Sequence, residues 1–354
     1  MSDFLSDLVK ELKDENTTIA SEGKSSAEFS GTIDTGSYLL NAVISGSLYG
    51  GVPNNKITGF AGEMATGKTF FVLGVVSQFL KANPEGGVIY FDTESAVTND
   101  MMESRGITTS RVVKSEPETI QKFRHTALQI LNNYLEQPED ERRPMIMILD
   151  SLGQLSTTKE VEDTASGSET RDMTKAQVIK ATFRVLNLRL AKAGVPLLVT
   201  NHVYEAVGSY IPMKEMSGGS GLKYSASTIV QLSKTKERVG TEVVGNIIKV
   251  KMYKSRLSRE NKEVGVLLSY DRGLDRYYGL VDHAVKAGVF NKSGNRIELP
   301  DGSKQYAKTI YDNPEKYFTD EVMTKLEEFA NAVFSYGVEE REGDEHYEVE
   351  DSIE

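Results

Sequence analysis

The stretch Gly62-Glu63-Met64-Ala65-Thr66-Gly67-Lys68-Thr69 decides the fold class of this chain. It matches the pattern G-x-x-x-x-G-K-[ST] of a phosphate-binding loop, and an apolar KITGF precedes it while a helix-like FFVLGVVSQFLKA follows. Glycines let the backbone wrap a phosphate, and the amides at the start of a helix face the anion. We expect Lys68 to reach the β- and γ-phosphates of a nucleotide and the Thr69 hydroxyl to bind Mg²⁺.

Two further apolar runs lead into acidic residues. Met145–Leu149 precedes Asp150, and Gly87–Phe91 leads to Glu94. Continuous hydrophobicity is typical of strands buried on both faces of a parallel sheet, whose ligands bind at the carboxyl ends of the strands. We expect Asp150 to support Mg²⁺ beside Thr69, although a strand-terminal Asp is also common without such a role. Glu94 could orient the attacking water toward the γ-phosphate.

A polar pair, Asn201-His202, follows a fourth apolar run at Pro196–Thr200. The same argument places this pair at the same edge of the sheet. There the two side chains could contact the γ-phosphate and report its presence to the segment that follows. His202 could instead be a structural histidine.

The rest of the chain predicts an α/β domain with smaller units at its ends. From about residue 30 to 270, short apolar strands alternate with helical patterns, which is typical of a mainly parallel sheet. Residues 279–337 differ, because a helix-like segment precedes a hairpin with an Asp301-Gly302 turn and an amphipathic stretch at Thr319–Tyr336. The predicted strands are Lys56–Phe60, Gly87–Phe91, Met145–Leu149, Pro196–Thr200, Thr228–Leu232, Ile247–Tyr253 and Gly265–Tyr270.

Composition excludes several kinds of site. The 354 residues contain no Cys and only four scattered His, so no disulfide, iron–sulfur cluster, thiolate zinc site or His-cluster metal site is expected. No apolar run approaches the ~18 residues of a membrane helix. The opening residues MSDFLSDLVKELKDE lack the core of a signal peptide. We therefore expect a cytoplasmic protein with no membrane partner.

The N-terminal segment carries an apolar stripe that it cannot bury alone. A polar linker follows the stripe, so the helix must pack on the main body or on another subunit. The residues that share the stripe are Phe4, Leu5, Leu8, Val9 and Leu12.

The net charge of −11 is concentrated at the C-terminus. Residues 339–354 contain nine acids and one Arg, a balance of −8, so the rest of the chain carries −11 + 8 = −3. We predict a disordered acidic tail over residues 338–354. It could serve solubility, or it could compete with a polyanion for a basic surface. The overall acidity therefore does not exclude DNA as a partner.

The segments GEMATGKT, FDTE, MIMILDS and LLVTNH, in this order, resemble the RecA family of strand-exchange recombinases. The upstream DTGSYLLNAVISGSLYGGVP and the later SGGSGLKYSAS and VKMYKSR are also similar to segments of that family. The Asn-His ending and SLGQL…TKEVED resemble the phage UvsX-type branch. The resemblance covers roughly residues 30–280. It implies a RecA-like P-loop ATPase core with a mainly parallel twisted sheet at 30–278, a small C-terminal α+β unit at 279–337, and an N-terminal helix and oligomerisation linker at 1–29.

This resemblance assigns roles to individual residues. Lys68, Thr69 and Asp150 would hold ATP and Mg²⁺, Glu94 would be the hydrolytic carboxylate, and Asn201-His202 would sense the γ-phosphate. Lys254 and Arg256 would reach into a neighbouring subunit's site, although they could also be a solvated basic strand end. Phe29 would help the N-terminal segment to dock on the adjacent subunit. Met101 stands where bacterial relatives place an aromatic ring against adenine, and a thioether can also pack on a base. The remaining loop residues that would contact the nucleotide are Gly62, Glu63, Met64, Ala65, Thr66 and Gly67.

Two loops would bind DNA. The first, Ser156–Asp172, has five acids against Lys159 and Arg171, so its phosphate contacts would come from backbone amides or helix N-termini. The second, Val203–Lys223, combines apolar side chains that can wedge between bases with cations and glycines; it could also be a plain surface loop. The residues predicted to contact DNA there are Tyr204, Tyr210, Ile211, Met213, Lys214, Gly218, Gly219 and Lys223.

The resemblance implies a DNA-dependent ATPase that forms helical homo-oligomers on single-stranded DNA and exchanges strands with duplex DNA. A single-strand-binding protein and a loading mediator would be its partners, and a phage-encoded chain would act in the host-cell cytoplasm. Two other functions stay open. A hexameric helicase motor uses the same core, and a nucleotide-gated filament scaffold would need no productive hydrolysis.

Overall fold

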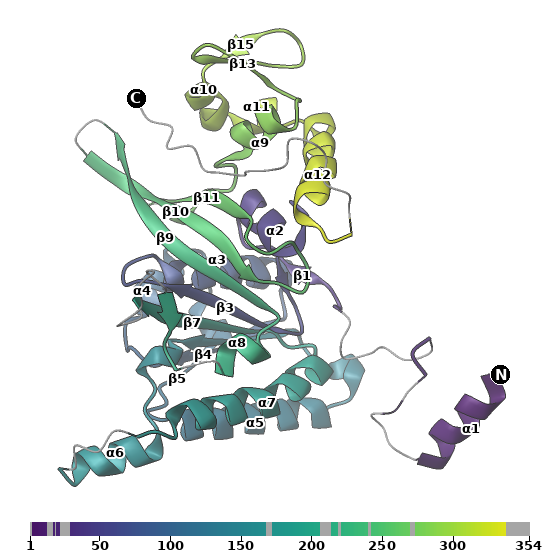
Figure 1. The fold of residues 1–354 in the computed structure, drawn as a ribbon, viewed down its shortest axis with the longest axis vertical. Helices are drawn as coiled ribbons and strands as arrows, with labels where there is room; N and C mark the ends of the chain where they lie inside the picture. The colour runs from purple at the N-terminus through teal and green to yellow at the C-terminus, as the bar shows by residue number, and fades with distance from the viewer. Residues whose placement is uncertain are drawn as a thin grey trace.

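The computed structural model describes residues 2–12, 17, 19–21, 29–167, 172–205, 214–218, 221–239, 242–269 and 273–337. Its central feature is one large sheet (Figure 1). The strands of this sheet are β3 Ile57–Gly62, β4 Gly87–Asp92, β5 Val112–Ser115, β6 Met145–Asp150, β7 Leu197–Glu205, β8 Lys214–Met216, β9 Thr228–Val239, β10 Glu242–Lys254, β11 Glu263–Ser269 and β12 Gly273–Leu274.

The order of the strands brings the predicted site residues to one edge. Six strands run parallel in the order β9-β3-β7-β6-β4-β5, and β10, β11 and β12 extend the sheet with antiparallel pairing beyond β9. Strand β8 pairs with the end of β7. The predicted α/β class with a mainly parallel sheet is therefore confirmed. All seven predicted strands are present, although Tyr270, the end of the last one, lies outside the described residues. The sequence patterns missed the short strands β8 and β12 and the edge strand β5, which is short and only half-buried.

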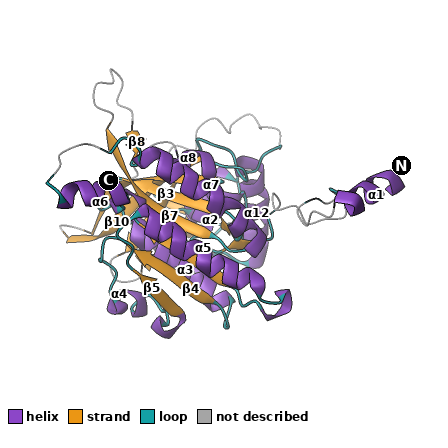
Figure 2. Ribbon diagram, turned by 90° about the horizontal axis from the view of Figure 1, so that it is seen from below, coloured by secondary structure: helices purple, strands orange, loops and turns teal. Residues whose placement is uncertain are grey.

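Helices cover both faces of the sheet, so the central strands are buried on both sides. Along β6, Ile146 and Ile148 pack in one hydrophobic cluster with α3, whereas Met147 and Leu149 pack in a second cluster with α5 and α7. This alternation is the two-residue period of a strand. Figure 2, seen from below, shows α5 and α7 side by side in front of the strands. The helices of the core are α2 Tyr38–Ser45, α3 Lys68–Ala82, α4 Asn99–Glu103, α5 Ile120–Glu136, α6 Thr158–Ala165, α7 Lys175–Ala193 and α8 Gly221–Ser225.

Local signals set the ends of these helices. The Thr119 side chain accepts a hydrogen bond from the amide of Lys122 and caps the start of α5. In α7, which packs against α5, Gly194 adopts a left-handed conformation (φ 63°) that terminates the helix.

The C-terminal segment folds against the core. Its hairpin and final helix agree with the prediction, and Phe290, Leu326 and Phe334 belong to the same hydrophobic cluster as Ile44 of α2. The domain boundary at residues 278–279 stays a prediction. The elements are α9 Leu280–Lys286, β13 Asn291–Ser293, β14 Arg296–Glu298, β15 Lys304–Gln305, α10 Ala307–Asp312, α11 Pro314–Tyr317 and α12 Asp320–Phe334.

Near the N-terminus, helix α1 (Ser2–Leu12) lies apart from the rest of the chain (Figure 1). Its apolar side chains Phe4, Leu5, Leu8 and Leu12 are exposed. A two-stranded ribbon, β1 (Thr32–Ile33) with β2 (Val52–Pro53), leads into the core. Among the described residues, no helix is both long enough and apolar enough to cross a membrane. The predicted acidic tail lies outside the described residues.

Candidate nucleotide site

The predicted phosphate loop connects β3 to α3 at the carboxyl edge of the parallel strands. Gly67 has a φ of 83°, and a side chain there would meet Leu268 at 2.5 Å. A side chain at Gly62 would meet the carbonyl oxygen of Leu232 at 2.8 Å. Only glycine fits these positions. The loop therefore has the tightly wound backbone that lets successive amides surround a phosphate group.

Lys68 lies inside this loop and is buried. Its Nζ donates to the carbonyl oxygens of Gly62 (3.1 Å) and Glu63 (2.8 Å) and lies 3.5 Å from Nδ1 of His202. Burial lowers the pKa of Lys68, while the carboxylates of Glu94 and Asp150 raise it. These contacts hold the ammonium group where the end of a bound triphosphate would meet it.

Asp150 is buried at the end of β6 and accepts hydrogen bonds from three hydroxyl groups. Thr69 Oγ1 and Tyr90 Oη donate to Oδ2 at 2.8 and 2.7 Å, and Thr200 Oγ1 donates to Oδ1. Burial, followed by the charge of Asp150, raises the pKa of the Tyr90 hydroxyl well above its usual value. The three donors come from α3, β4 and β7, so they fix the orientation of the carboxylate.

The Thr69–Asp150 pair fits the chemistry of a Mg²⁺ site. Both groups offer hard oxygen atoms, and Mg²⁺ in nucleotide sites is held by one or two protein oxygens together with phosphate oxygens and water. Among the described residues no cluster of three or more His, Cys, Asp or Glu could hold a metal by itself. A metal here would therefore depend on the nucleotide's own oxygens.

Glu94 lies just beyond the end of β4, beside β6. Its Oε1 accepts a hydrogen bond from Ser151 Oγ (2.6 Å) and lies 3.1 Å from Nε2 of His202. The imidazole of His202 thus lies between the loop lysine, through Nδ1, and this carboxylate, through Nε2. The structure brings together five of the residues that sequence reasoning selected: Lys68, Thr69, Glu94, Asp150 and His202.

Asn201 and His202, which directly precede the second predicted DNA loop, are joined to Ser217 within that loop. The backbone oxygen of His202 accepts from the amide of Ser217 (2.9 Å), and the Asn201 side chain donates to the oxygen of Ser217 (2.9 Å). Strand β8 then pairs with β7, with Val203 opposite Met216. A displacement of His202 would therefore move the base of this loop.

Among the described DNA-loop residues, Tyr204, Lys214 and Gly218 lie at that base, whereas Lys223 lies near the start of β3 beside Lys254. Tyr204 is exposed, and Lys223 donates to Tyr253 Oη at 2.6 Å. Gly218 lies at the turn after β8, and Lys214 begins β8. Lys159 lies in α6, a helix within the first loop that the sequence analysis did not predict. The predicted residues Arg171, Tyr210, Ile211, Met213 and Gly219 lie outside the described residues.

Met101, the predicted base contact, lies in the short helix α4. Its carbonyl oxygen accepts a hydrogen bond from Arg105 (2.9 Å), and the Arg105 guanidinium stacks over Phe70, 4.3 Å from the ring centroid. Phe70 follows Thr69 in α3, so this stacked pair joins α4 to the phosphate loop. The role of Met101 stays a prediction.

Lys254 and Arg256 lie at the opposite end of the sheet. Lys254 is paired with Ile229 on β9, which is itself paired with Gly59 near the start of β3. The phosphate loop begins three residues further along β3, about 10 Å away at the rise of a strand. Lys254 donates to the carbonyl oxygens of Lys223 (2.6 Å) and Ala226 (2.8 Å) and so caps the end of α8.

Arg256 is the more available of the two cations. It is exposed, and within the part of the chain that the structure describes it makes no hydrogen bond or ion pair. Its charge contributes, after burial, to lowering the pKa of Lys56 and Lys254. Both cations therefore lie away from the phosphate loop of their own chain.

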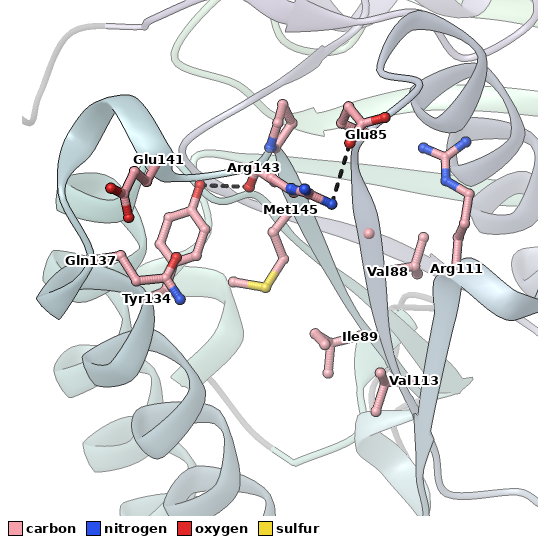
Figure 3. A pocket seen from close by; sticks show the side chains of 12 residues that line it. Glu85, Val88, Ile89, Arg111, Val113, Tyr134, Gln137, Glu141, Arg143 and Met145 are labelled. Atoms are coloured by element: carbon pink, nitrogen blue, oxygen red, sulfur yellow. Dashed lines mark hydrogen bonds and ion pairs between the residues drawn. The ribbon is translucent and has the colours of Figure 1, made fainter.

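A hollow of about 400 Å³ lies at the amino ends of β4 and β6, away from the phosphate loop (Figure 3). Apolar side chains of Val88, Ile89, Val113 and Met145 line it. The pair Arg143–Glu85 (3.2 Å) lies at its rim. Because its lining offers neither a phosphate loop nor paired acids, we assign it no catalytic role.

Sequence reasoning missed the residues that hold the site in place. Tyr90, Thr200 and Ser151 are hidden within apolar runs or follow them directly, so no spacing marks them. The one available signal for Tyr90 and Thr200 is a polar group inside an otherwise apolar strand, since such a group needs a partner when it is buried.

Comparison with known proteins finds a family that matches most of the chain. Residues 5–275 match the RecA N-terminal domain family. The chain is 28 % identical over 257 residues to the recombination and repair protein of Enterobacteria phage T4, a match that covers 73 % of this chain and 64 % of that protein. It is 29 % identical over 324 residues to a Protein RecA of Thermus thermophilus, covering 88 % of this chain and 89 % of that one. Protein RecA of Deinococcus radiodurans is 27 % identical over 295 residues, covering 80 % of this chain and 76 % of that one.

Proposed function

The chain belongs to the RecA family, and from this premise we propose that it is a DNA-dependent ATPase that forms helical filaments on single-stranded DNA. In these filaments it would pair and exchange homologous DNA strands. The observation that carries the proposal is the unbroken set of contacts from Lys68 and Glu94 through His202 to Ser217 at the base of the second loop. This set can couple the state of the γ-phosphate to the DNA-binding surface.

The site residues divide the work of hydrolysis. The loop amides and Lys68 would hold the phosphates, and Glu94 would orient the attacking water. Thr69 and Asp150 would hold Mg²⁺, which neutralises charge that develops on the phosphate oxygens. Because Ser151 and His202 both hold Glu94, its carboxylate is oriented before the substrate arrives. Met101 would pack against the base.

DNA binding would use the two loops at this end of the molecule. Tyr204 offers an exposed ring on which a base can stack, a contact that tolerates any sequence. The start of α6 carries a capping box at Thr157 and Glu160, so phosphate contacts there would compete with acidic side chains. This arrangement favours Val203–Lys223 as the principal DNA contact.

Self-assembly would add a neighbour's cation to the nucleotide site and would cover the exposed apolar stripe of α1. An isolated helix of 11 residues such as α1 is marginally stable in water, and its exposed apolar stripe needs a partner. We infer that it docks on the next subunit, where the apolar hollow that Val113 lines offers a seat. In the same assembly Arg256 would approach the neighbour's phosphate loop. A single-strand-binding protein and a loading mediator stay predictions.

Steady-state ATP hydrolysis with and without single-stranded DNA, followed by electron microscopy and a D-loop assay, tests this function. We expect DNA-stimulated hydrolysis, helical filaments and D-loops. Lys68→Ala should lose nucleotide binding because the phosphates lose their loop cation. Glu94→Gln should bind ATP and DNA, lose hydrolysis, and form filaments that dissociate more slowly.

The alternatives give different results in the same experiments. Rings in place of filaments would indicate a helicase motor. Filaments without D-loops would indicate a scaffold. Normal DNA-stimulated hydrolysis by Lys68→Ala would refute the assignment of the phosphate loop.

A further inference from the structure

The turn that carries Glu94 is anchored at both of its ends. At the first end, the amide of Thr93 donates to the carbonyl oxygen of Asp150 (2.8 Å), and Thr93 Oγ1 accepts from the amide of Ser151 (2.8 Å). These bonds join the turn to β6, the strand that carries the predicted Mg²⁺ ligand. Glu94 is the next residue, so its backbone is fixed on this side.

At the second end, the buried carboxylate of Asp92 lies close to backbone amides of the turn. Asp92 is only 1 % exposed. Its Oδ1 lies 3.3 Å from the amide of Glu94 and 3.4 Å from that of Ala96, and its Oδ2 lies 3.2 Å from that of Val97. Three amides that converge on one carboxylate define the path of residues 93–97. Glu94 lies within this path.

One cation completes the arrangement, and it comes from a strand that sequence analysis missed. Lys114 lies on β5, opposite Tyr90 of β4. Its Nζ lies 3.4 Å from Asp92 Oδ2 and donates to the carbonyl oxygen of Val97 at 2.7 Å. The ammonium group therefore links the carboxylate to the last carbonyl of the turn. Among the described residues, this is the ion pair that compensates the buried charge of Asp92.

We propose that Lys114 is a positioning residue for ATP hydrolysis, which holds the turn 93–97 through Asp92 and so aims Glu94 at the attacking water. The inference rests on the proposed function, since it presupposes that Glu94 acts on that water. Without the ammonium group, the buried carboxylate of Asp92 loses its counter-ion, a change that is costly in a protein interior. Residues 93–97 would then rearrange, and a displacement of about 1 Å is enough to slow a positioned reaction severely.

The test is the variant Lys114→Met, which keeps most of the length of the side chain and removes the charge. We expect kcat for DNA-stimulated ATP hydrolysis to fall about tenfold, with KM for ATP changed less than about twofold. Affinity for single-stranded DNA with a non-hydrolysable ATP analogue should be unchanged. Filaments formed with ATP should dissociate more slowly, as those of Glu94→Gln should. Lys114→Arg should recover part of kcat because it restores the cation.

Two further variants separate positioning from general stability. Lys325→Met removes an exposed ion pair of α12 (2.8 Å) far from the site and should leave all measurements at wild-type values. Asp92→Asn should lower kcat as Lys114→Met does, and the double variant should be no slower than either single one, because the two residues act as a unit. If a single variant is too unstable to assay, this comparison uses Lys114→Arg with Asp92→Asn.

The possible failures are distinguishable. Wild-type kcat in Lys114→Met would overturn the inference. A fall in DNA affinity that parallels the fall in kcat would overturn it too, because it would indicate a general structural role. If Glu94→Gln itself hydrolyses ATP at the wild-type rate, the assignment of Glu94 in the proposed function fails, whatever Lys114→Met does.

Discussion

Asp150 shows how single side chains set the chemistry of this site. Its two oxygens accept from hydroxyl groups of Thr69, Tyr90 and Thr200, which come from three different elements. A carboxylate held in this way keeps one rotamer and stays available to a cation that lies beside the Thr69 hydroxyl. Tyr90 is fully buried, so its hydroxyl has no water to replace Asp150 as a partner.

Tyr90→Phe isolates that hydrogen bond. We expect the free energy of unfolding in urea to fall by about 1–2 kcal/mol, because a buried bond to a charged acceptor is lost. Hydrolysis should fall less than about threefold, since Thr69 and Thr200 still orient the carboxylate. Tyr306→Phe, at an exposed tyrosine of the C-terminal segment, is the matched control and should change neither quantity. Equal stability of Tyr90→Phe and wild type would contradict this account of Asp150.

At the scale of elements, helices α9 and α12 of the C-terminal segment pack against each other. Both belong to the hydrophobic cluster that also contains α2. His283 of α9 is fully buried, and its Nε2 donates to the carbonyl oxygen of Leu326 (3.1 Å) while its ring lies against Phe329 and Phe334. Burial lowers the pKa of His283 from 6.5 to about 4. The folded state therefore holds this imidazole neutral.

This burial predicts a specific loss of stability in acid. Between pH 6.5 and about 4 the unfolded chain binds a proton at His283 that the folded chain does not, so stability falls as the pH is lowered through this range. The contribution is about 3 kcal/mol at most. Urea unfolding across the range should show a shallower pH dependence for His283→Gln, which keeps a donor for Leu326 but does not titrate. Identical slopes for variant and wild type would refute the assignment.

At the scale of the whole molecule, the pairing of β10, β9 and β3 places Arg256 at the wrong end of the sheet for its own phosphate loop. A site completed between subunits follows if this cation acts in hydrolysis. One subunit would supply Lys68, Glu94 and Asp150, and the next would supply Arg256. Such a trans cation can contribute a factor of about 10³–10⁵ to the rate.

Mixing two inactive variants tests this directly. Neither Glu94→Gln nor Arg256→Ala filaments should hydrolyse ATP well. In an equal mixture with random assembly, about a quarter of the interfaces combine an intact Glu94 with an intact Arg256, so activity should return to that extent. A mixture of Glu94→Gln with Lys68→Ala should stay inactive, because both changes lie on the same side of the interface. No recovery in labelled, verified mixed filaments would show that Arg256 does not act between subunits.

Patterns in the sequence are enough to predict the phosphate loop, the apolar strands that surround it and the acidic or polar residues at their carboxyl ends. These features are local: a loop pattern, a run of residues buried on both faces and a strand terminus can each be identified within about ten residues. Local patterns are therefore enough to predict Lys68, Asp150, Glu94 and His202 as site residues. The strand β5 is not predicted from the sequence because VVKS is too short and too exposed to be distinguished from a loop.

The side chains that hold these residues, and the position of Lys254 and Arg256, depend on the tertiary structure. The partners of Asp150 depend on β4 and β7 flanking β6, and the Lys114–Asp92 pair depends on β5 lying beside β4. Lys254 and Arg256 lie far from their own phosphate loop because β10 runs antiparallel to β9. Strand order and register arise from the packing of the whole sheet between its helices. Strand order and register therefore depend on contacts between residues that are far apart in the chain, and no local sequence pattern predicts them.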